Sequence, residues 1–328
     1  MRFSYKDKSV RLTGRWDTSG ECAVTTAPGS YIEFSFDGDM AVARFDIEDN
    51  KTPYPHLWIQ LDDGNMTEAP LDAYLRVRAN GYGVHVCRII YKGGEEAYSR
   101  WYAPLHGKIS FKGYDADASA PLPEDNRKTV EFIGDSITEG VLIDDDYNGD
   151  EKGVWDLDQQ NRIYQDDVCA TYAWHIAKHY NLRPFFMAYG AVGITKSGQG
   201  NVPDVKTAYP YNFDGSEKTY SDCDYIMINH GSNDMGSTPE KYIAGYVKLL
   251  DEVRAMNKKS KIIVILPFCG CFAEQLEKAV SDYNKDNNDD ISFIDTRGAY
   301  TSGPFHPLRR SHKLIADFII DKLADIIK

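Results

Sequence analysis

The sequence lacks the marks of several protein classes. No apolar run is long enough to cross a bilayer, and the first residues contain no apolar segment of signal-peptide length. Positive charge is scarce: 37 Lys and Arg stand against 50 Asp and Glu in 328 residues, which gives a formal net charge of −13. Such an acidic balance disfavours nucleic acid and anionic membranes as partners and is compatible with a neutral small substrate. We therefore expect a cytoplasmic globular protein.

Cysteine and histidine spacing exclude two further classes. The six cysteines are scattered and do not form the framework of a small disulfide-rich domain. Cys269-Gly-Cys271 has no second pair at zinc-like spacing. His175 and His179 lie one helical turn apart but lack the glutamate of a zincin motif. We expect free thiols, no bound metal and no cofactor.

The first third of the chain has the pattern of an all-β domain. Short alternating segments, bounded by turns such as Asp37-Gly-Asp39, recur at 31–36, 40–47, 56–61, 84–91 and 108–114. Even spacing without a helical period predicts a sandwich or jelly roll over residues 1–120. Its aromatic residues, Trp58 and Trp101 among them, form either a sugar-stacking surface or core and inter-domain packing.

A stretch of prolines, small residues and charges at 115–127 then changes the composition and predicts a boundary before a second domain, 128–328. Beyond it, strands and helices alternate. Ser237-Thr238-Pro239-Glu240 predicts a helix start, with capping hydroxyls, proline in the first turn and an acidic residue at the positive end. The alternation predicts an α/β fold, in which a parallel sheet lies between helices and ligands bind at the carboxyl ends of strands.

One serine stands where a strand gives way to a helix. The apolar segment 130–133 breaks at Gly134, and Ser136 follows two residues later. A tight turn of this kind lifts the hydroxyl out at the carboxyl edge of a sheet, and the following helix presents its amino end to developing negative charge. Ser136 is therefore a candidate nucleophile, and we expect Asp135 to brace the turn through hydrogen bonds.

Three later loops carry residues that complete this chemistry. Gly193 follows one predicted strand and lets a backbone N–H approach a ligand closely. Asn233 follows another strand and offers a side-chain amide, and His306 supplies an imidazole before the last helix. The set predicts acyl transfer, in which Ser136 attacks a carbonyl and His306 moves the proton. The N–H groups of Ser136 and Gly193, with the Asn233 amide, would hold the oxyanion.

The order of these pieces resembles the SGNH (GDSL-type) hydrolase family. The four blocks of that family match Gly134-Asp135-Ser136, Gly193, Gly231-Ser232-Asn233-Asp234 and His306, and the resemblance covers residues 128–328. With an all-β domain in front, the chain further resembles carbohydrate esterase family 2, two-domain deacetylases of plant polysaccharides. That resemblance implies a jelly roll followed by a three-layer catalytic domain. It also implies a serine esterase that releases acetate from acetylated xylo-, manno- or gluco-oligosaccharides.

The chain departs from the SGNH pattern at one position. The family usually places an aspartate three residues before the histidine, where it orients the imidazole. Here that position is Gly303, and Asp295 is too far along the chain to replace the aspartate. Some members of carbohydrate esterase family 2 work without this aspartate. We expect a Ser–His dyad in which a backbone carbonyl orients His306.

Two alternatives remain open at this level. A lipase, thioesterase or arylesterase could use the same scaffold, although no apolar lid is evident in the sequence. A carbohydrate-binding protein with an impaired site would explain the absent aspartate, although serine, glycine, asparagine and histidine are all retained. Trp155, in the acidic insertion after the nucleophile, and His230, beside Asn233, are candidates for substrate binding; packing without substrate contact is the alternative for each.

Overall fold

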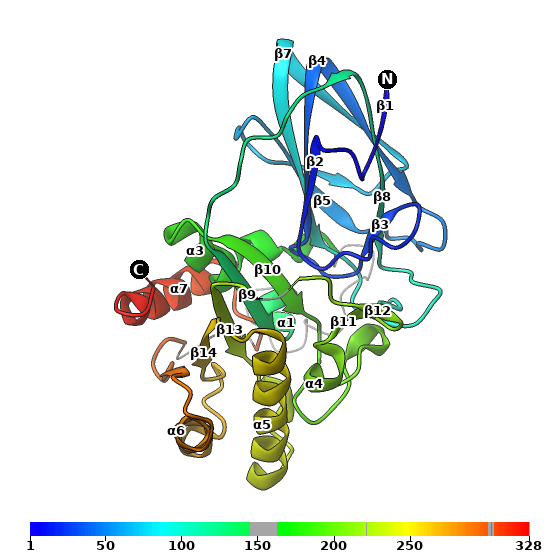
Figure 1. Cartoon of the computed structure of the whole chain (residues 1–328). Helices are drawn as coiled ribbons and strands as arrows, with labels where there is room; N and C mark the ends of the chain where they lie inside the picture. Colours follow the sequence, from blue (N-terminus) through cyan, green and yellow to red (C-terminus); the bar gives the residue numbers. More distant parts are fainter. Residues whose placement is uncertain (145–162, 221, 301–302, 304, 328) are drawn as a thin grey trace.

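The amino-terminal part of the chain forms an antiparallel sheet, and the remainder forms a parallel sheet covered by helices (Figure 1). The computed structural model describes residues 1–144, 163–220, 222–300, 303 and 305–327. In Figure 1 the antiparallel sheet stands above the parallel one, and the two parts pack against each other.

Eight strands form the antiparallel sheet, in the order β1-β8-β4-β7-β5-β6, with β2 paired to β4 and β3 paired to β8. Their bounds are β1 Arg2–Ser4, β2 Val10–Thr13, β3 Ala23–Thr25, β4 Tyr31–Asp46, β5 His56–Leu61, β6 Thr67–Pro70, β7 Tyr74–Gly93 and β8 Ile109–Ser119. Aromatic rings fill the interior, where Phe34 stacks on Tyr114 with centroids 4.5 Å apart. This is the all-β domain that the strand pattern predicts.

β4 and β7 are longer than the sequence pattern indicates. β4 joins the predicted strands 31–36 and 40–47, because Asp37-Gly-Asp39 does not reverse the chain. A register shift between Gly38 and Met40 forms an irregularity within the pairing of β4 with β7. Between these pairs β4 advances by two residues, from Gly38 to Met40, and β7 by five, from Arg78 to Gly83, so the extra residues of β7 interrupt the pairing without ending either strand. The prediction of a chain-reversing turn at 37–39 is therefore wrong.

Five parallel strands form the second sheet, in the order β10-β9-β13-β14-β15. Their bounds are β9 Thr129–Gly134, β10 Arg183–Ala188, β13 Tyr225–Asn229, β14 Lys261–Ile265 and β15 Ser292–Ile294; β11 Tyr211–Phe213 and β12 Ser216–Glu217 form a separate hairpin. The α-helices whose bounds lie within the described residues are α1 Ser136–Glu139, α3 Tyr172–His179, α4 Val205–Ala208, α5 Pro239–Met256, α6 Ala273–Asn287 and α7 Arg309–Leu323. The α/β fold class predicted from the alternation is confirmed.

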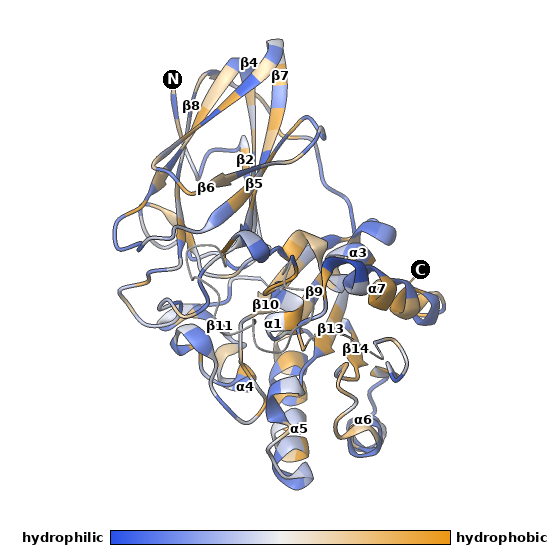
Figure 2. Ribbon diagram, turned by 180° about the vertical axis from the view of Figure 1, so that it is seen from behind, coloured by the Kyte–Doolittle hydropathy of each residue, from blue (hydrophilic) through white to orange (hydrophobic). Residues whose placement is uncertain are grey.

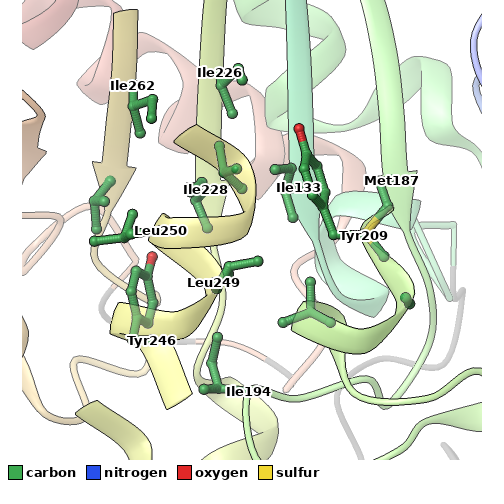
Figure 3. Close-up of a cluster of buried hydrophobic side chains, with 14 of the residues drawn as sticks. Ile133, Met187, Ile194, Tyr209, Ile226, Ile228, Tyr246, Leu249, Leu250 and Ile262 are labelled. Carbon is green, nitrogen blue, oxygen red and sulfur yellow. The ribbon is translucent and has the colours of Figure 1, made fainter. Parts of the chain in front are cut away.

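Both faces of the parallel sheet are buried under helices. Alternate residues of each strand face opposite sides, so Ile226 and Ile228 of β13 join the cluster under α4, α5 and α6. Met227 joins the opposite cluster under α3 and α7. Figure 3 shows the first cluster, in which Leu249 and Leu250 of α5 lie against the strands. The result is the three-layer arrangement of the fold class.

The helix boundaries follow local signals. α5 begins as predicted, with Pro239 in the first turn and the Thr238 hydroxyl accepting the Lys241 N–H at 3.3 Å. The helices around the parallel sheet carry both hydrophobic and hydrophilic residues, as a helix with one buried face should (Figure 2). Among the described residues, no helix combines the length and apolar character needed to cross a membrane.

Two buried ion pairs join the two parts of the molecule. Arg15 of the amino-terminal part donates to Glu131 of β9 at 2.9 Å, and both side chains are almost fully buried. Arg100, from the loop after β7, pairs with Glu139 of α1. Trp101 beside it is only 3% exposed and belongs to the core under the parallel sheet. For Trp101, inter-domain packing is therefore the correct alternative.

Candidate active site

The turn between β9 and α1 places Ser136 at the first position of α1, at the carboxyl edge of the sheet. Asp135 caps the helix, because its Oδ1 accepts the Ile137 N–H at 3.0 Å. The hydrogen-bonding role predicted for Asp135 is confirmed. Gly134 has no room for a side chain, since a Cβ there would lie 2.0 Å from Thr138 Oγ1. The turn is therefore tightly closed under the serine.

Burial changes the chemistry of Asp135. The side chain is 1% exposed, and this loss of solvent raises its pKa from 3.8 to about 7. The nearby Cys269 and Asp234 act in the same direction, whereas the hydrogen bond from Ile137 opposes the rise. Asp135, next to Ser136, is therefore largely protonated only below about pH 7.

His306 faces the serine from the opposite end of the chain. Its Nε2 lies 2.9 Å from Ser136 Oγ, although the two residues are 170 positions apart. Both side chains are buried, with 4% of Ser136 and 7% of His306 exposed. This distance is that of a hydrogen bond between a nucleophile and its base.

The segment that carries His306 is anchored to the segment after Ser136. The Arg309 N–H donates to the Ile143 carbonyl at 2.9 Å, and the Arg309 guanidinium donates to Asp167 at 2.8 Å and to Asp144 at 2.7 Å. These contacts join the start of α7 to both ends of the insertion after the nucleophile.

A second connection runs through buried side chains. His312 of α7 accepts the Tyr172 N–H at 3.0 Å, and Tyr172 Oη lies 2.9 Å from Thr138 Oγ1 of α1. Burial lowers the pKa of His312 to about 3, so the ring is neutral and can serve as this acceptor. Neither anchor is predicted from the sequence, because each depends on residues more than thirty positions apart.

Gly303 occupies the slot of the family's aspartate, and its backbone explains why no side chain is present. Its φ is 133°, a region that favours glycine. A Cβ at this position would lie 2.3 Å from Tyr300 Oη. Asp295 is paired with Arg297 at 2.6 Å. The carbonyl partner of His306 stays a prediction, and residues 301, 302 and 304 lie outside the described part of the chain.

Two of the three predicted oxyanion donors, Asn233 and Gly193, lie on neighbouring loops. Asn233 Nδ2 donates to the Val192 carbonyl at 3.0 Å and lies 3.4 Å from Asp135 Oδ2. The Gly193 N–H donates to the Lys196 carbonyl at 3.0 Å, so in this structure it is engaged within its own loop. The oxyanion role of these groups and of the Ser136 N–H stays a prediction.

Asp234 holds the glycine loop in place. Its carboxylate accepts the N–H groups of Ile194 and Thr195, each at 2.8 Å, and the Thr195 hydroxyl at 2.6 Å. A Cβ on Gly193 would come within 2.9 Å of both carboxylate oxygens. The close approach of Asp234 therefore requires a glycine at position 193. Through this contact Asp234 connects the Asn233 loop to the Gly193 loop.

His230 and Trp155 are the two residues predicted to contact substrate. His230 is 0% exposed, and burial lowers its pKa to about 4, so it packs beneath the Asn233 loop as a neutral ring. His230 directly follows the buried strand β13, and its contact with substrate stays a prediction. Trp155 lies outside the described residues.

Sequence reasoning missed one exposed aromatic residue. Phe305 is 48% exposed, and its ring meets the His306 ring edge-on with centroids 5.3 Å apart. An aromatic residue directly before the histidine was the available signal. Among the described residues there is no group of three or more His, Cys, Asp or Glu side chains arranged to hold a metal ion.

Comparison with known proteins gives a likeness in structure. No family model matches the chain, and no curated protein matches it in sequence. A family two carbohydrate esterase from Clostridium thermocellum, solved in complex with cellohexaose, superposes with a TM-score of 0.73 at 20% identity over 96% of this chain and 98% of that one. A family two carbohydrate esterase from Cellvibrio japonicus gives 0.77 at 16% identity over 100% and 98%. The acetyl xylan esterase Est2A from Butyrivibrio proteoclasticus gives 0.76 at 18% identity over 98% and 96%.

These superpositions cover both parts of the chain, the antiparallel sheet as well as the parallel one. The fold implied by the sequence resemblance is thereby confirmed. The protein has the two-domain fold of the family two carbohydrate esterases.

Proposed function

We propose that this protein is a serine esterase that removes O-acetyl groups from oligosaccharides. The observation that carries the proposal is the 2.9 Å contact between His306 Nε2 and Ser136 Oγ at the carboxyl edge of the parallel sheet. A buried serine and imidazole at this distance can share and transfer a proton, and the similar fold of known carbohydrate esterases supports the reaction class.

The reaction begins with proton transfer from Ser136 Oγ to His306 Nε2 as the oxygen attacks the acetyl carbonyl. The tetrahedral intermediate collapses when its bond to the sugar oxygen breaks, and His306 donates the proton to that oxygen. The acetyl group remains on Ser136. Water then attacks this ester, His306 takes and returns a proton, and acetate leaves with the serine restored.

Asn233 is the best-supported donor to the intermediate's negative oxygen. The hydrogen bond from Nδ2 to the Val192 carbonyl fixes the amide plane. At 3.4 Å the second contact, to Asp135, is long for a hydrogen bond and can be exchanged for one to an oxyanion. The Ser136 N–H is the second donor. The Gly193 N–H would have to be shared with the Lys196 carbonyl, so we give it a smaller part.

The proposed substrate is an acetylated xylo-, manno- or gluco-oligosaccharide. Phe305, exposed beside His306, offers a face on which a sugar ring can stack. A net charge of −13 suits a neutral carbohydrate better than an anionic ester. In a cytoplasmic protein, short imported oligosaccharides would be the natural form of this substrate.

The test is acetate release from a panel of acetylated xylo- and manno-oligosaccharides, with wild type measured beside Ser136→Ala. We expect release by the wild type and none above background by the variant, and the ranking of the panel identifies the sugar. Turnover of long acyl esters in place of acetylated sugars would replace this proposal with a lipase or thioesterase. Sugar binding without any turnover would replace it with a carbohydrate-binding protein.

A further inference from the structure

Two cysteines lie beside the candidate site and almost touch each other. Cys269 and Cys271 follow β14 at the carboxyl edge of the parallel sheet, with Gly270 between them at a φ of 69°. Their sulfur atoms are 2.9 Å apart, while a disulfide bond is about 2.05 Å long. A shift of about 1 Å would therefore bring the two sulfurs to bonding distance.

Cys269 differs from the other cysteines in reactivity. It is exposed, and the hydrogen bond from the Cys271 thiol lowers its pKa to about 6. Burial raises the pKa of the thiols of Cys87, Cys169 and Cys223. Because the thiolate is the attacking species in thiol–disulfide exchange, an accessible sulfur of lowered pKa reacts first.

The pair also contacts the loop that carries Asn233. Cys271 Sγ lies 3.3 Å from the carbonyl oxygen of Gly231, two residues before Asn233. The charge of Cys269 acts on Asp135, which caps the helix of Ser136. A change in bonding at the two sulfurs therefore affects both the loop that carries Asn233 and the environment of Asp135.

We propose that Cys269 and Cys271 form a reversible disulfide beside the Asn233 loop and that its formation lowers the activity of the site. The second half of this statement rests on the esterase function proposed above. The co-reactant is a low-molecular-weight disulfide, such as oxidised glutathione. The esterase mechanism proposed above does not use either cysteine.

The reaction proceeds by two exchanges. The Cys269 thiolate attacks one sulfur of the external disulfide and releases one thiol, leaving a mixed disulfide on Cys269. Cys271 then loses its proton and attacks Cys269 Sγ, which releases the second thiol. The two protein thiols are oxidised to one disulfide, and the external disulfide is reduced to two thiols.

The structural consequence follows from the contact with Gly231. Oxidation draws Cys271 Sγ toward Cys269 Sγ, so the 3.3 Å contact between Cys271 Sγ and the Gly231 carbonyl oxygen changes. Gly231 and Asn233 lie in one short loop, and a displacement of the Asn233 amide by a fraction of an ångström weakens its hold on an oxyanion. The expected loss of turnover is about ten- to a hundredfold.

To test this, the wild type is incubated with glutathione at increasing ratios of the oxidised to the reduced form. Free thiols are then alkylated, and the mass of the tryptic peptide 262–278 is measured by mass spectrometry. We expect this peptide to lose two hydrogens and escape alkylation, while Cys269→Ser and Cys271→Ser do not form the internal bond. Cys22→Ser, in the other domain, is the matched control and behaves as wild type. Alkylation of both thiols at every ratio, or a mixed disulfide as the end product, would overturn the proposal.

Acetate release is measured on the same samples. We expect the oxidised wild type to regain full activity with dithiothreitol and Cys269→Ser, which lacks the attacking thiolate, to be insensitive to oxidation. A disulfide without change in turnover would overturn the coupling to the site. If the protein releases no acetate in either state, the esterase proposal fails, and the peptide mass still decides whether the disulfide forms.

Discussion

The contact between Ser136 and His306 gives the site its chemistry, and the residues around it determine how far the site departs from a complete triad. At position 303 the departure is built into the backbone, which has a φ of 133° and passes against Tyr300. The imidazole must be oriented from elsewhere than an aspartate in this slot.

The first prediction therefore concerns an attempt to restore that aspartate. Gly303→Asp should not raise the rate of acetate release, and it should lower the free energy of unfolding by about 1–3 kcal/mol, because a non-glycine residue is strained there. Activity assays and denaturant unfolding of the variant check both parts. A variant with higher activity and unchanged stability would show that the backbone at position 303 can accept an aspartate that orients His306.

The second prediction concerns the pH dependence of stability. Because Asp135 has a pKa of about 7 when folded and 3.8 otherwise, the stability that it contributes is complete below about pH 4 and is lost as the pH rises through 7. The loss is at most about 4 kcal/mol. Asp135→Asn keeps the acceptor for the Ile137 N–H and does not titrate.

Denaturant unfolding at pH 5 and pH 8 checks this. The wild type should lose more stability than Asp135→Asn between the two values. Equal losses in both proteins would mean that Asp135 is ionised throughout this range.

For single residues, the sequence predicts which side chains are candidates for the site better than it predicts their contacts. Ser136 and His306 could be identified because strand ends point to one edge of a sheet. The engagement of the Gly193 N–H by Lys196, the burial of His230 and the anchoring of α7 by Arg309 could not, because each depends on how loops fold back on one another.

Among the elements, the turn from β9 into α1 matters most, because it fixes the direction of the serine. Its tightness comes from packing Thr138 directly on Gly134. The sequence predicts the turn from its glycine, but the partner that excludes a side chain is seen only in the structure.

The third prediction tests this packing. Gly134→Ala should cost about 1–3 kcal/mol of stability, the usual cost of overpacking, and should reduce acetate release at least tenfold by moving Ser136. Gly236→Ala is the matched control, since no atom lies within 4 Å of the added Cβ. Thermal unfolding and activity are measured for both. Equal behaviour of the two variants would contradict the role given to Gly134.

Strand and helix positions in the parallel sheet follow from the sequence to within a few residues, as the apolar segment 130–133, which lies within β9, and the start of α5 show. The antiparallel sheet is harder to predict. The residues Asp37-Gly-Asp39 predict a turn, but β4 continues through them because it pairs with both β7 and β8. Local turn propensity is outweighed there by pairing with two long neighbours.

In the whole molecule, the two domains are held together by buried charge. Arg100 is fully buried and contacts both Glu139 and the ring of Tyr189, 5.1 Å from its centroid. Burial raises the pKa of Glu139, so its ionised form depends on this partner. We propose residues 1–120 and 128–328 as the domain boundaries, and the sequence does not reveal that Arg15 and Arg100 cross between them.

The fourth prediction follows from this dependence. Arg100→Met should destabilise the protein by about 3–5 kcal/mol, since it leaves a buried carboxylate without its partner. Glu139→Gln in the same chain should recover part of the loss. Arg2→Met, which breaks an exposed pair with Asp115, should cost less than about 1 kcal/mol. Denaturant unfolding of the four proteins decides the matter, and equal costs for Arg100→Met and Arg2→Met would contradict it.

In the proposed mechanism His306 activates Ser136 as a nucleophile, and this activation can be measured with a fluorophosphonate probe that bonds covalently to activated serines. The rate of labelling is followed by mass spectrometry of the peptide that carries Ser136, in wild type and in His306→Ala. We expect one label, on Ser136, and labelling at least about a hundredfold slower in the variant, the usual contribution of a general base. No label on Ser136, or a labelling rate that does not depend on His306, would show that His306 does not activate Ser136.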